Sequence, residues 1–225
     1  MKKIKIVGAG GIGSILLPLL ARFLDTKNDK AIITVIDGDS YEEKNRSRQL
    51  FDAFGNKADV SVGMIEKVFT NIQFRSRPEY LTPTSALYLL DEGDIIFSCV
   101  DNHKTRKLIS EFCENELDEF YLFSGGNEFT DGNIQLFFRA NGKNLTLPLT
   151  NNYHPEIKNP ADKRPDEIGC GEMTESAPQL IFMNNMISAL MLNSFYTQFY
   201  EEGGCKYSEV YSDIITNNCR SLTRK

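Results

Sequence analysis

The sequence has few of the residues from which disulfide frameworks and zinc centres are built. Its five cysteines lie at irregular spacing in 225 residues, and an odd number argues against a disulfide framework. No two of them form a CxxC pair, so a structural zinc site is not supported. Cys99 and Cys113 fall in apolar stretches and are expected in the core. Cys170, Cys205 and Cys219 remain open to other roles.

Long apolar runs and an excess of positive charge are also missing. No apolar stretch approaches the roughly 18–20 residues needed to cross a bilayer. The lysine-rich start is broken by glycines, so it is more typical of a strand and turn than of a signal peptide. A formal net charge of −6 disfavours non-specific nucleic-acid binding. We therefore expect a cytoplasmic protein that binds neither membrane nor nucleic acid.

Alternating strand and helix patterns fill the first part of the chain. Strands are predicted over 3–7, 31–36, 72–75, 94–100 and 119–123, and helices over 11–24, 57–69, 84–90 and 103–117. Such alternation implies right-handed βαβ units. The sequence therefore predicts an α/β fold with a mostly parallel sheet flanked by helices.

The pattern changes after Gly132. A strand over 133–140 follows the preceding strand without a helix and is expected to run antiparallel. A long loop is predicted over 141–170, then a helix that a capping box at Ser176–Gln179 opens and that ends near Phe199, then a strand over 209–215. We expect one domain over 1–225, with a first half over 1–130 and a second part, with added antiparallel strands, over 131–225.

A glycine-rich turn directly follows the first predicted strand. Gly8, Gly10 and Gly13 fit the pattern GxGxxG, and Gly11 lies between them. Glycines there allow backbone to approach a phosphate at the positive end of a helix. A tight turn without a ligand would use the same residues. In this context we interpret 1–130 as a Rossmann-like nucleotide-binding half.

Acidic residues stand at the end of the second predicted strand. Asp37 is placed where an acid of this fold accepts hydrogen bonds from ribose hydroxyls, and Asp39 follows it. A dinucleotide dehydrogenase would use such an acid in the same way, and a solvated strand-end acid needs no ligand. Asp37 alone therefore does not distinguish ATP from a redox cofactor.

Polar and cationic residues after this strand favour ATP. Asn45, Arg48, Gln49 and Lys57 follow closely, and a triphosphate that is to be cleaved needs fixed positive charge on its phosphates. Ordinary surface charge would explain any one of the cations taken alone. Redox chemistry gives Arg48 and Lys57 no task, so the group as a whole predicts an ATP site.

A further acid follows the fourth predicted strand. Asp101 and Asn102 lie at the carboxyl edge of a parallel sheet, where ligands bind. The Asp101 carboxylate could hold Mg²⁺ against phosphate oxygens. A simple helix N-cap would also explain the pair, and the two roles are compatible.

Four motifs in order resemble one family. They are G-x-G-G-x-G, D-x-D-x5-N-x2-R-Q, G-x-K at residues 55–57, and D-I-I-F-S-C-V-D-N-x2-T-R from Asp94. In sequence and spacing they resemble the ThiF/MoeB/HesA E1-like, ubiquitin-activating-type adenylating enzymes over residues 3 to about 200. The segments VIDGDSYEEKNRSRQLF and CGEMTESAPQLIFMNN look most similar to the short ThiF-like proteins of plasmid-borne PRTRC systems.

The resemblance implies an activity and assigns residues to it. Such enzymes use ATP and Mg²⁺ to adenylate the C-terminal carboxylate of a ubiquitin-like or sulfur-carrier protein ending in Gly-Gly, and a homodimer or a pairing with a related chain is implied. By position, the ribose acid is Asp37, the Mg²⁺ acid is Asp101, and the phosphate-contacting residues are Asn45, Arg48, Gln49 and Lys57. A carboxylate already ionised at neutral pH needs no general base, so neither histidine, His103 nor His154, is given a catalytic role.

The fate of the adenylate depends on Cys170. It lies at the end of the long loop, shortly before a predicted helix N-terminus, where a thiol pKa can be lowered. It is therefore the candidate nucleophile, beside Arg48, Lys57 and Asp101. A small loop cysteine, or a loose zinc set with Cys205 and Cys219, are the alternatives. At the level of the whole protein, the alternatives are a catalytically silent partner of an E1-like heterodimer and an NAD(P)-binding protein.

Overall fold

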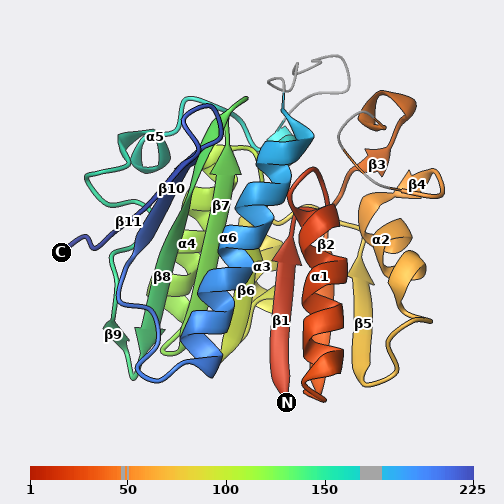
Figure 1. The fold of residues 1–225 in the computed structure, drawn as a ribbon, viewed down its shortest axis with the longest axis horizontal. Helices are drawn as coiled ribbons and strands as arrows, with labels where there is room; N and C mark the ends of the chain where they lie inside the picture. Colours follow the sequence, from red (N-terminus) through yellow and green to blue (C-terminus); the bar gives the residue numbers. More distant parts are fainter. Residues whose placement is uncertain (47–48, 50, 168–178) are drawn as a thin grey trace.

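The computed structural model describes residues 1–46, 49, 51–167 and 179–225. In this part of the chain a nine-stranded sheet has the order β11-β10-β8-β7-β6-β1-β2-β5, with β9 paired to β8 (Figure 1). Its parallel strands are β1 (Lys2–Val7), β2 (Ala31–Ile36), β5 (Ile72–Arg77), β6 (Asp94–Ser98) and β7 (Phe120–Asn127). Its antiparallel strands are β8 (Asp131–Ala140), β9 (Lys143–Asn144), β10 (Glu209–Asp213) and β11 (Asn218–Leu222).

Helices cover both faces of the sheet. One face carries α1 (Gly13–Thr26), α2 (Lys57–Ile65) and α6 (Ile181–Tyr200), and the other carries α3 (Pro83–Leu89), α4 (His103–Glu116) and α5 (Pro155–Lys158). Successive strand residues point to opposite faces. In β6, for example, Ile95 and Phe97 pack under α1 and α6, whereas Ile96 packs under α3 and α4. Two buried faces explain the nearly continuous apolar runs of these strands.

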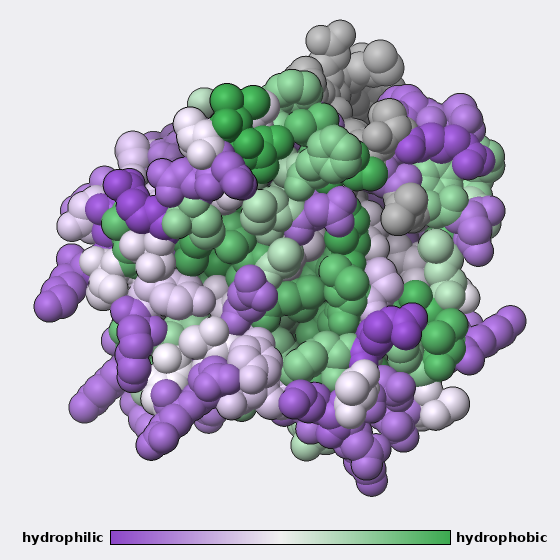
Figure 2. Space-filling model, viewed as in Figure 1, coloured by the Kyte–Doolittle hydropathy of each residue, from purple (hydrophilic) through white to green (hydrophobic). Residues whose placement is uncertain are grey.

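The helix α6 is unusual because none of its twenty residues is charged. Phe182 on α6 is 68% exposed, and Leu19 on the neighbouring α1 is 47% exposed. Figure 2 shows an apolar surface across the middle of this face, over α6 and α1. No helix among the described residues has the length and apolar character that crossing a membrane requires.

The order of the strands reverses between β1 and β6. β2 and β5 follow on one side of β1, whereas β6 and β7 follow on the other. The loops that leave β1 and β6 therefore diverge at one edge of the sheet, which is where ligands of such sheets bind. The glycine turn leaves β1 at this point, and Asp101 follows β6.

Most of the predicted elements are present, three predictions are wrong in detail, and one small ladder was not predicted. The helix predicted over 57–69 ends at Ile65. A turn follows, in which the Val68 N–H bonds to the Ile65 carbonyl, and this turn brings Phe69 into the core. The predicted loop over 141–170 contains β9, α5 and a 3-10 turn, η2 (Pro165–Glu167). The C-terminal segment forms two strands, not one, because Asn217 takes a positive φ of 49° and turns the chain back. The small ladder β3 (Ser40–Tyr41) to β4 (Gly55–Asn56) was not predicted.

The helices α1 and α6 contain or follow the proline and capping residues noted in the sequence. α1 contains Pro18, which lacks an N–H, yet the helix continues to Thr26. α6 begins at Ile181 after an N-cap at Leu180. Most of the predicted capping box, Ser176 to Pro178, lies outside the described residues.

Candidate nucleotide-binding site

The glycine turn is packed so tightly that a side chain is excluded at Gly8 and at Gly13. Gly8 has a φ of +95°, and a Cβ on it would lie 3.0 Å from the carbonyl carbon of Cys99. A Cβ on Gly13 would lie 1.9 Å from the Gly8 carbonyl oxygen. The N-cap of α1 is Ile12, which offers no side-chain hydrogen bond. The N–H groups of Ser14 and Ile15 bond to the carbonyl oxygens of Gly10 and Ile12, so the N–H groups that can bind an anion are those just before them, in the glycine turn.

Asp37 connects the end of β2 to this turn. Its Oδ2 accepts a hydrogen bond from the Ala9 N–H at 2.6 Å, and its Oδ1 accepts one from the Asp39 N–H at 2.8 Å. Burial raises the pKa of Asp37, and the charge of Lys57 opposes the rise. Each carboxylate oxygen retains capacity for a further hydrogen bond, as a ribose hydroxyl would require.

Asp39 gathers two side chains beside Asp37. Lys57 Nζ lies 2.9 Å from Asp39 Oδ2, and the Tyr80 hydroxyl donates to Oδ1 at 2.6 Å. Burial acts to raise the pKa of Asp39, but the charge of Lys57 and these hydrogen bonds lower it overall. The Tyr80 ring fits because the neighbouring residue is Gly38, where a Cβ would lie 2.6 Å from ring atoms. Nothing in the sequence pattern pointed to Tyr80.

Asn45 and Gln49 lie in the segment that follows β3. The Asn45 side chain is buried and its Oδ1 accepts the Glu42 N–H at 2.8 Å, so this oxygen serves the local 3-10 turn, η1 (Glu43–Asn45). Gln49 is 4% exposed, and its Oε1 has no hydrogen-bond partner among the described residues. Its Nε2 lies 3.7 Å from where a Cβ on Gly10 would be. Arg48 lies outside the described residues.

Asp101 has a different environment at the end of β6. Its side chain is exposed and makes no hydrogen bond or ion pair within the described part of the chain. Asn102 is the N-cap of α4, since its Oδ1 accepts the Thr105 N–H at 2.8 Å. In the described ranges no three His, Cys, Asp or Glu side chains are placed to hold a metal ion. Asp101 thus fits a cation that phosphate oxygens also coordinate, rather than one bound by protein alone.

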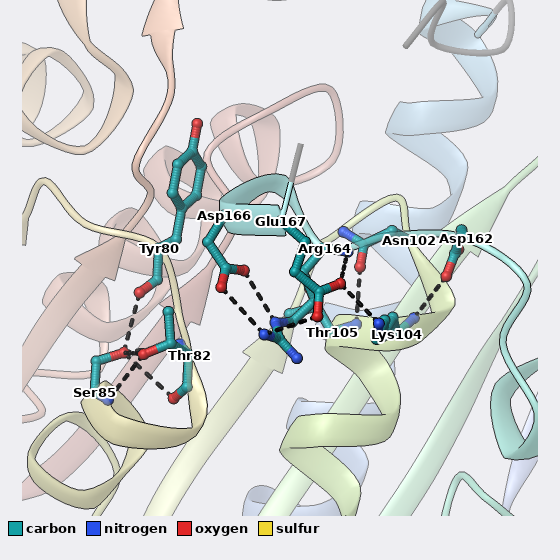
Figure 3. A network of polar contacts seen from close by, with 10 residues as sticks. All are labelled: Tyr80, Thr82, Ser85, Asn102, Lys104, Thr105, Asp162, Arg164, Asp166 and Glu167. Atoms are coloured by element: carbon teal, nitrogen blue, oxygen red, sulfur yellow. Dashed lines mark hydrogen bonds and ion pairs between the residues drawn. The ribbon is translucent and has the colours of Figure 1, made fainter. Parts of the chain in front are cut away.

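A segment from the second half of the chain contacts the start of α4, which follows Asp101 in the sequence (Figure 3). The carboxylate of Asp162 accepts the backbone N–H groups of His103 at 2.6 Å and Lys104 at 3.0 Å. Lys104 also pairs with Glu167 at 2.8 Å. Figure 3 shows Asp162 and Glu167 reaching the start of α4 from a loop that also carries Arg164 and Asp166. This contact could not be predicted from local pattern, because His103 and Asp162 are 59 residues apart.

The buried guanidinium of Arg106 ties the ends of β6 and β7 together. It donates to the carbonyl oxygens of Val100 at 2.9 Å and Gly125 at 3.2 Å. Burial lowers the pKa of Arg106, and the negative charge of Asp101 opposes this shift. Gly126 must lack a side chain, since a Cβ there would lie 2.1 Å from an Arg106 nitrogen. Arg106 therefore holds the strand end that precedes Asp101, and its guanidinium is hydrogen-bonded to backbone carbonyl oxygens.

These residues fit a nucleotide polyphosphate with a divalent cation. Side chains are excluded at Gly8 and Gly13, the start of α1 has no side-chain cap, and the Nε2 of the buried Gln49 lies near Gly10. Asp37 and Asp101 lie at the ends of β2 and β6, which flank β1 in the sheet. The fold defines an α/β protein of Rossmann-like architecture, and the site has the features that a bound nucleotide would need.

Comparison with known proteins identifies the family. The model of the ThiF family matches residues 1–198, so the chain belongs to the ThiF family. It is 30% identical over 113 residues to "Adenylyltransferase and sulfurtransferase uba4" of Aspergillus niger, covering 48% of this chain and 22% of that protein. It is 29% identical over 149 residues to "Ubiquitin-like modifier-activating enzyme 5" of Gallus gallus, covering 59% and 36%. The chain thus spans well under half of the length of these relatives.

Solved structures have the same fold. E. coli MccB, crystallised with ATP, matches with a TM-score of 0.71 at 18% identity, covering 99% of this chain and 63% of that one. PaaA matches with a TM-score of 0.72 at 13% identity, covering 99% and 73%. The predicted family and the predicted fold class are both confirmed. The roles of individual site residues stay predictions.

The cysteines divide into three groups. Cys99 and Cys113 are buried in the core, as predicted, and burial raises the pKa of Cys99 to about 12. Cys205 is half-buried, with its Sγ 3.3 Å from the Ser194 carbonyl oxygen, and Cys219 is exposed on β11. The candidate nucleophile, Cys170, lies outside the described residues.

Proposed function

We propose that this protein uses ATP and Mg²⁺ to adenylate the C-terminal carboxylate of a ubiquitin-like or sulfur-carrier protein. The supporting observation is the arrangement of Asp37 and Asp101 at the ends of β2 and β6, on the two sides of the uncapped start of α1. ThiF-family membership and relatives named as adenylyltransferases and activating enzymes point the same way.

Each site residue has a task in this reaction. Asp37 would accept ribose hydroxyls, while Asn45 and Gln49 would contact phosphates at the glycine turn. Lys57 and Arg48 would supply positive charge to the phosphate chain. Asp101, with Asn102 beside it, would hold Mg²⁺, which when bound screens phosphate charge.

The chemistry is one of positioning. A carboxylate oxygen of the carrier forms a bond to the α-phosphorus as the bond to the pyrophosphate oxygen breaks, so an acyl-adenylate and pyrophosphate result. The carboxylate is ionised at neutral pH, so no side chain needs to remove a proton. This agrees with a site in which neither histidine takes part: His154 is buried between Glu156 and Glu209, 3.0 Å from each.

The proposal extends to partners and to the fate of the product. The carrier would end in Gly-Gly, and Cys170 is the candidate to accept it from the adenylate. We also propose that residues 1–225 act as one domain and that the protein works as a homodimer or with a related chain. The exposed apolar side chains Phe182, on the uncharged helix α6, and Leu19, on α1, support the dimer, because large apolar patches mark interaction sites.

ATP–pyrophosphate exchange with a Gly-Gly-ending carrier tests the function. We expect exchange from the wild type, and loss of exchange in Asp101→Ala. Asp131→Ala is the matched control, since Asp131 is an exposed acid at the same edge of the sheet, at the start of β8, and should retain exchange. Tight ATP binding without exchange would contradict adenylation and favour a silent partner, whereas tight NADH binding would favour an NAD(P)-binding protein.

A further inference from the structure

The helix α6 contacts the glycine turn at Gly11 and Ile12. Ser188 is fully buried, and its Oγ lies 2.9 Å from the Ile12 carbonyl oxygen, at the start of α1. One turn earlier on α6, Asn184 lies against Gly11. A Cβ on Gly11 would be 2.4 Å from Asn184 Nδ2, so the missing side chain of Gly11 is what admits the Asn184 amide.

Asn184 is a buried polar group without a partner. Its exposed fraction is 0%, and neither Oδ1 nor Nδ2 has a hydrogen-bond partner among the described residues. A buried, unpaired amide destabilises a fold, and an apolar side chain of similar size would fill the space without that cost. Packing alone therefore does not explain an asparagine at this position.

Two other features of the turn point to the same ligand. The start of α1 has no side-chain cap, and the Nε2 of the buried Gln49 lies 3.7 Å from where a Cβ on Gly10 would be. Side-chain amide nitrogens, which can donate to an anion, thus reach Gly10 and Gly11 from two separate segments of the chain. An anion held by the start of α1 would lie within the reach of such groups.

We propose that Asn184 is a phosphate-binding residue, whose Nδ2 donates a hydrogen bond to a phosphate oxygen of the nucleotide at the glycine turn. This inference rests on the proposed function. It adds a phosphate-binding side chain from α6, in the second part of the chain, to a site otherwise formed by residues of the first half. The Nδ2 group, which has no partner among the described residues of the free protein, then gains one in the nucleotide complex.

The test compares Asn184→Leu with Asn185→Leu in the full chain. Asn185 is the matched control, because it is the adjacent asparagine of α6, is exposed, and donates only to the Ile181 carbonyl, at 3.1 Å. Isothermal titration measures binding of ATP, ADP and adenosine, and thermal unfolding measures the stability of the ligand-free protein. Asn184→Ala is the second variant, should leucine disturb the fold.

We expect Asn184→Leu to weaken ATP and ADP binding by about 10- to 100-fold, the range for a hydrogen bond to a charged group. Adenosine binding should be unchanged, and the melting temperature of the ligand-free protein should rise. The control should change none of these. Unchanged ATP and ADP binding would overturn the proposal, as would an equal loss for adenosine, since that would reveal an effect on the shape of the turn.

Exchange activity of the wild type, measured in parallel, separates the two proposals. Phosphate-dependent loss of binding in Asn184→Leu, together with no exchange by the wild type, would contradict adenylation alone. Wild-type exchange together with unchanged nucleotide binding by Asn184→Leu would contradict the role of Asn184 alone.

Discussion

The carboxylates of Asp37 and Asp101 end neighbouring parts of the same sheet in opposite environments. Asp37 is fixed by two backbone N–H groups and packed beside Asp39, Lys57 and Tyr80. Asp101 is exposed and makes no hydrogen bond in the described structure. The difference shows that one acid belongs to the folded framework, whereas the other is available to a ligand. Substitutions should therefore affect stability at one position and turnover at the other.

The largest effect is expected where the framework around Asp37 is broken. Gly13→Ala places a Cβ 1.9 Å from the Gly8 carbonyl oxygen, so the turn that donates to Asp37 must open. We expect unfolding free energy to fall by about 2–4 kcal/mol and nucleotide binding to be lost. Urea unfolding and calorimetric titration measure both.

Gly63→Ala is the control for that substitution. Gly63 lies in α2, and a Cβ there meets nothing within 4 Å. The variant should be more stable by about 0.5–1 kcal/mol, because alanine favours a helix over glycine. A Gly13→Ala protein as stable as the wild type would contradict the packing of the turn.

The next effect isolates Asp101. Asp101→Asn should reduce ATP–pyrophosphate exchange by about 100-fold or more, since it removes the charge that would hold Mg²⁺. The urea midpoint should stay at the wild-type value because the side chain is exposed and unpaired. A large loss of stability with normal exchange would show that Asp101 has a structural role and does not take part in the reaction.

Asp37→Asn should show the opposite balance. The amide cannot accept from both Ala9 and Asp39, so one buried N–H loses its partner. We expect a loss of about 1–3 kcal/mol in unfolding free energy and about tenfold weaker ATP binding. Unchanged stability would show that the carboxylate does not brace the turn.

The smallest effect concerns pH. The folded-state pKa of Asp37 is raised, so ionised Asp37 costs stability above that pKa, and the cost disappears as the pH falls below the unfolded value. ATP binding should weaken as Asp37 becomes protonated. Lys57→Met removes the charge that opposes the rise, so the weakening should begin at higher pH than in the wild type. Calorimetric titrations from about pH 5 to 8 measure ATP binding by the two proteins. If binding weakens over the same pH range in both, Lys57 does not affect the pKa of Asp37.

The sequence predicted the features that local pattern controls. The parallel strands, the glycine turn and the acids at strand ends follow from periodicity and spacing, and the apolar run of β6 placed Asp101 at the correct edge. The family resemblance followed from the same segments.

What could not be predicted depends on contacts between distant segments. Tyr80 meets Asp39 because the ends of β5 and β2 adjoin, and Asp162 meets α4 because a long connection folds back over the sheet. Asn184 has the appearance of an ordinary helix residue in the sequence, and only the three-dimensional contact with Gly11 distinguishes it from Asn185. No local periodicity records such pairings.

The connection from β9 to η2 has a consequence for how the protein opens. It is attached at several points: for example, the Leu149 N–H bonds to Ser110 Oγ, His154 bonds to Glu209, and Asp162 bonds to the start of α4. Closing a loop costs entropy that grows with its length, and these attachments divide one long loop into short ones. Amide hydrogen exchange along residues 145–167 should therefore follow the opening of the sheet and α4, not that of an independent surface loop.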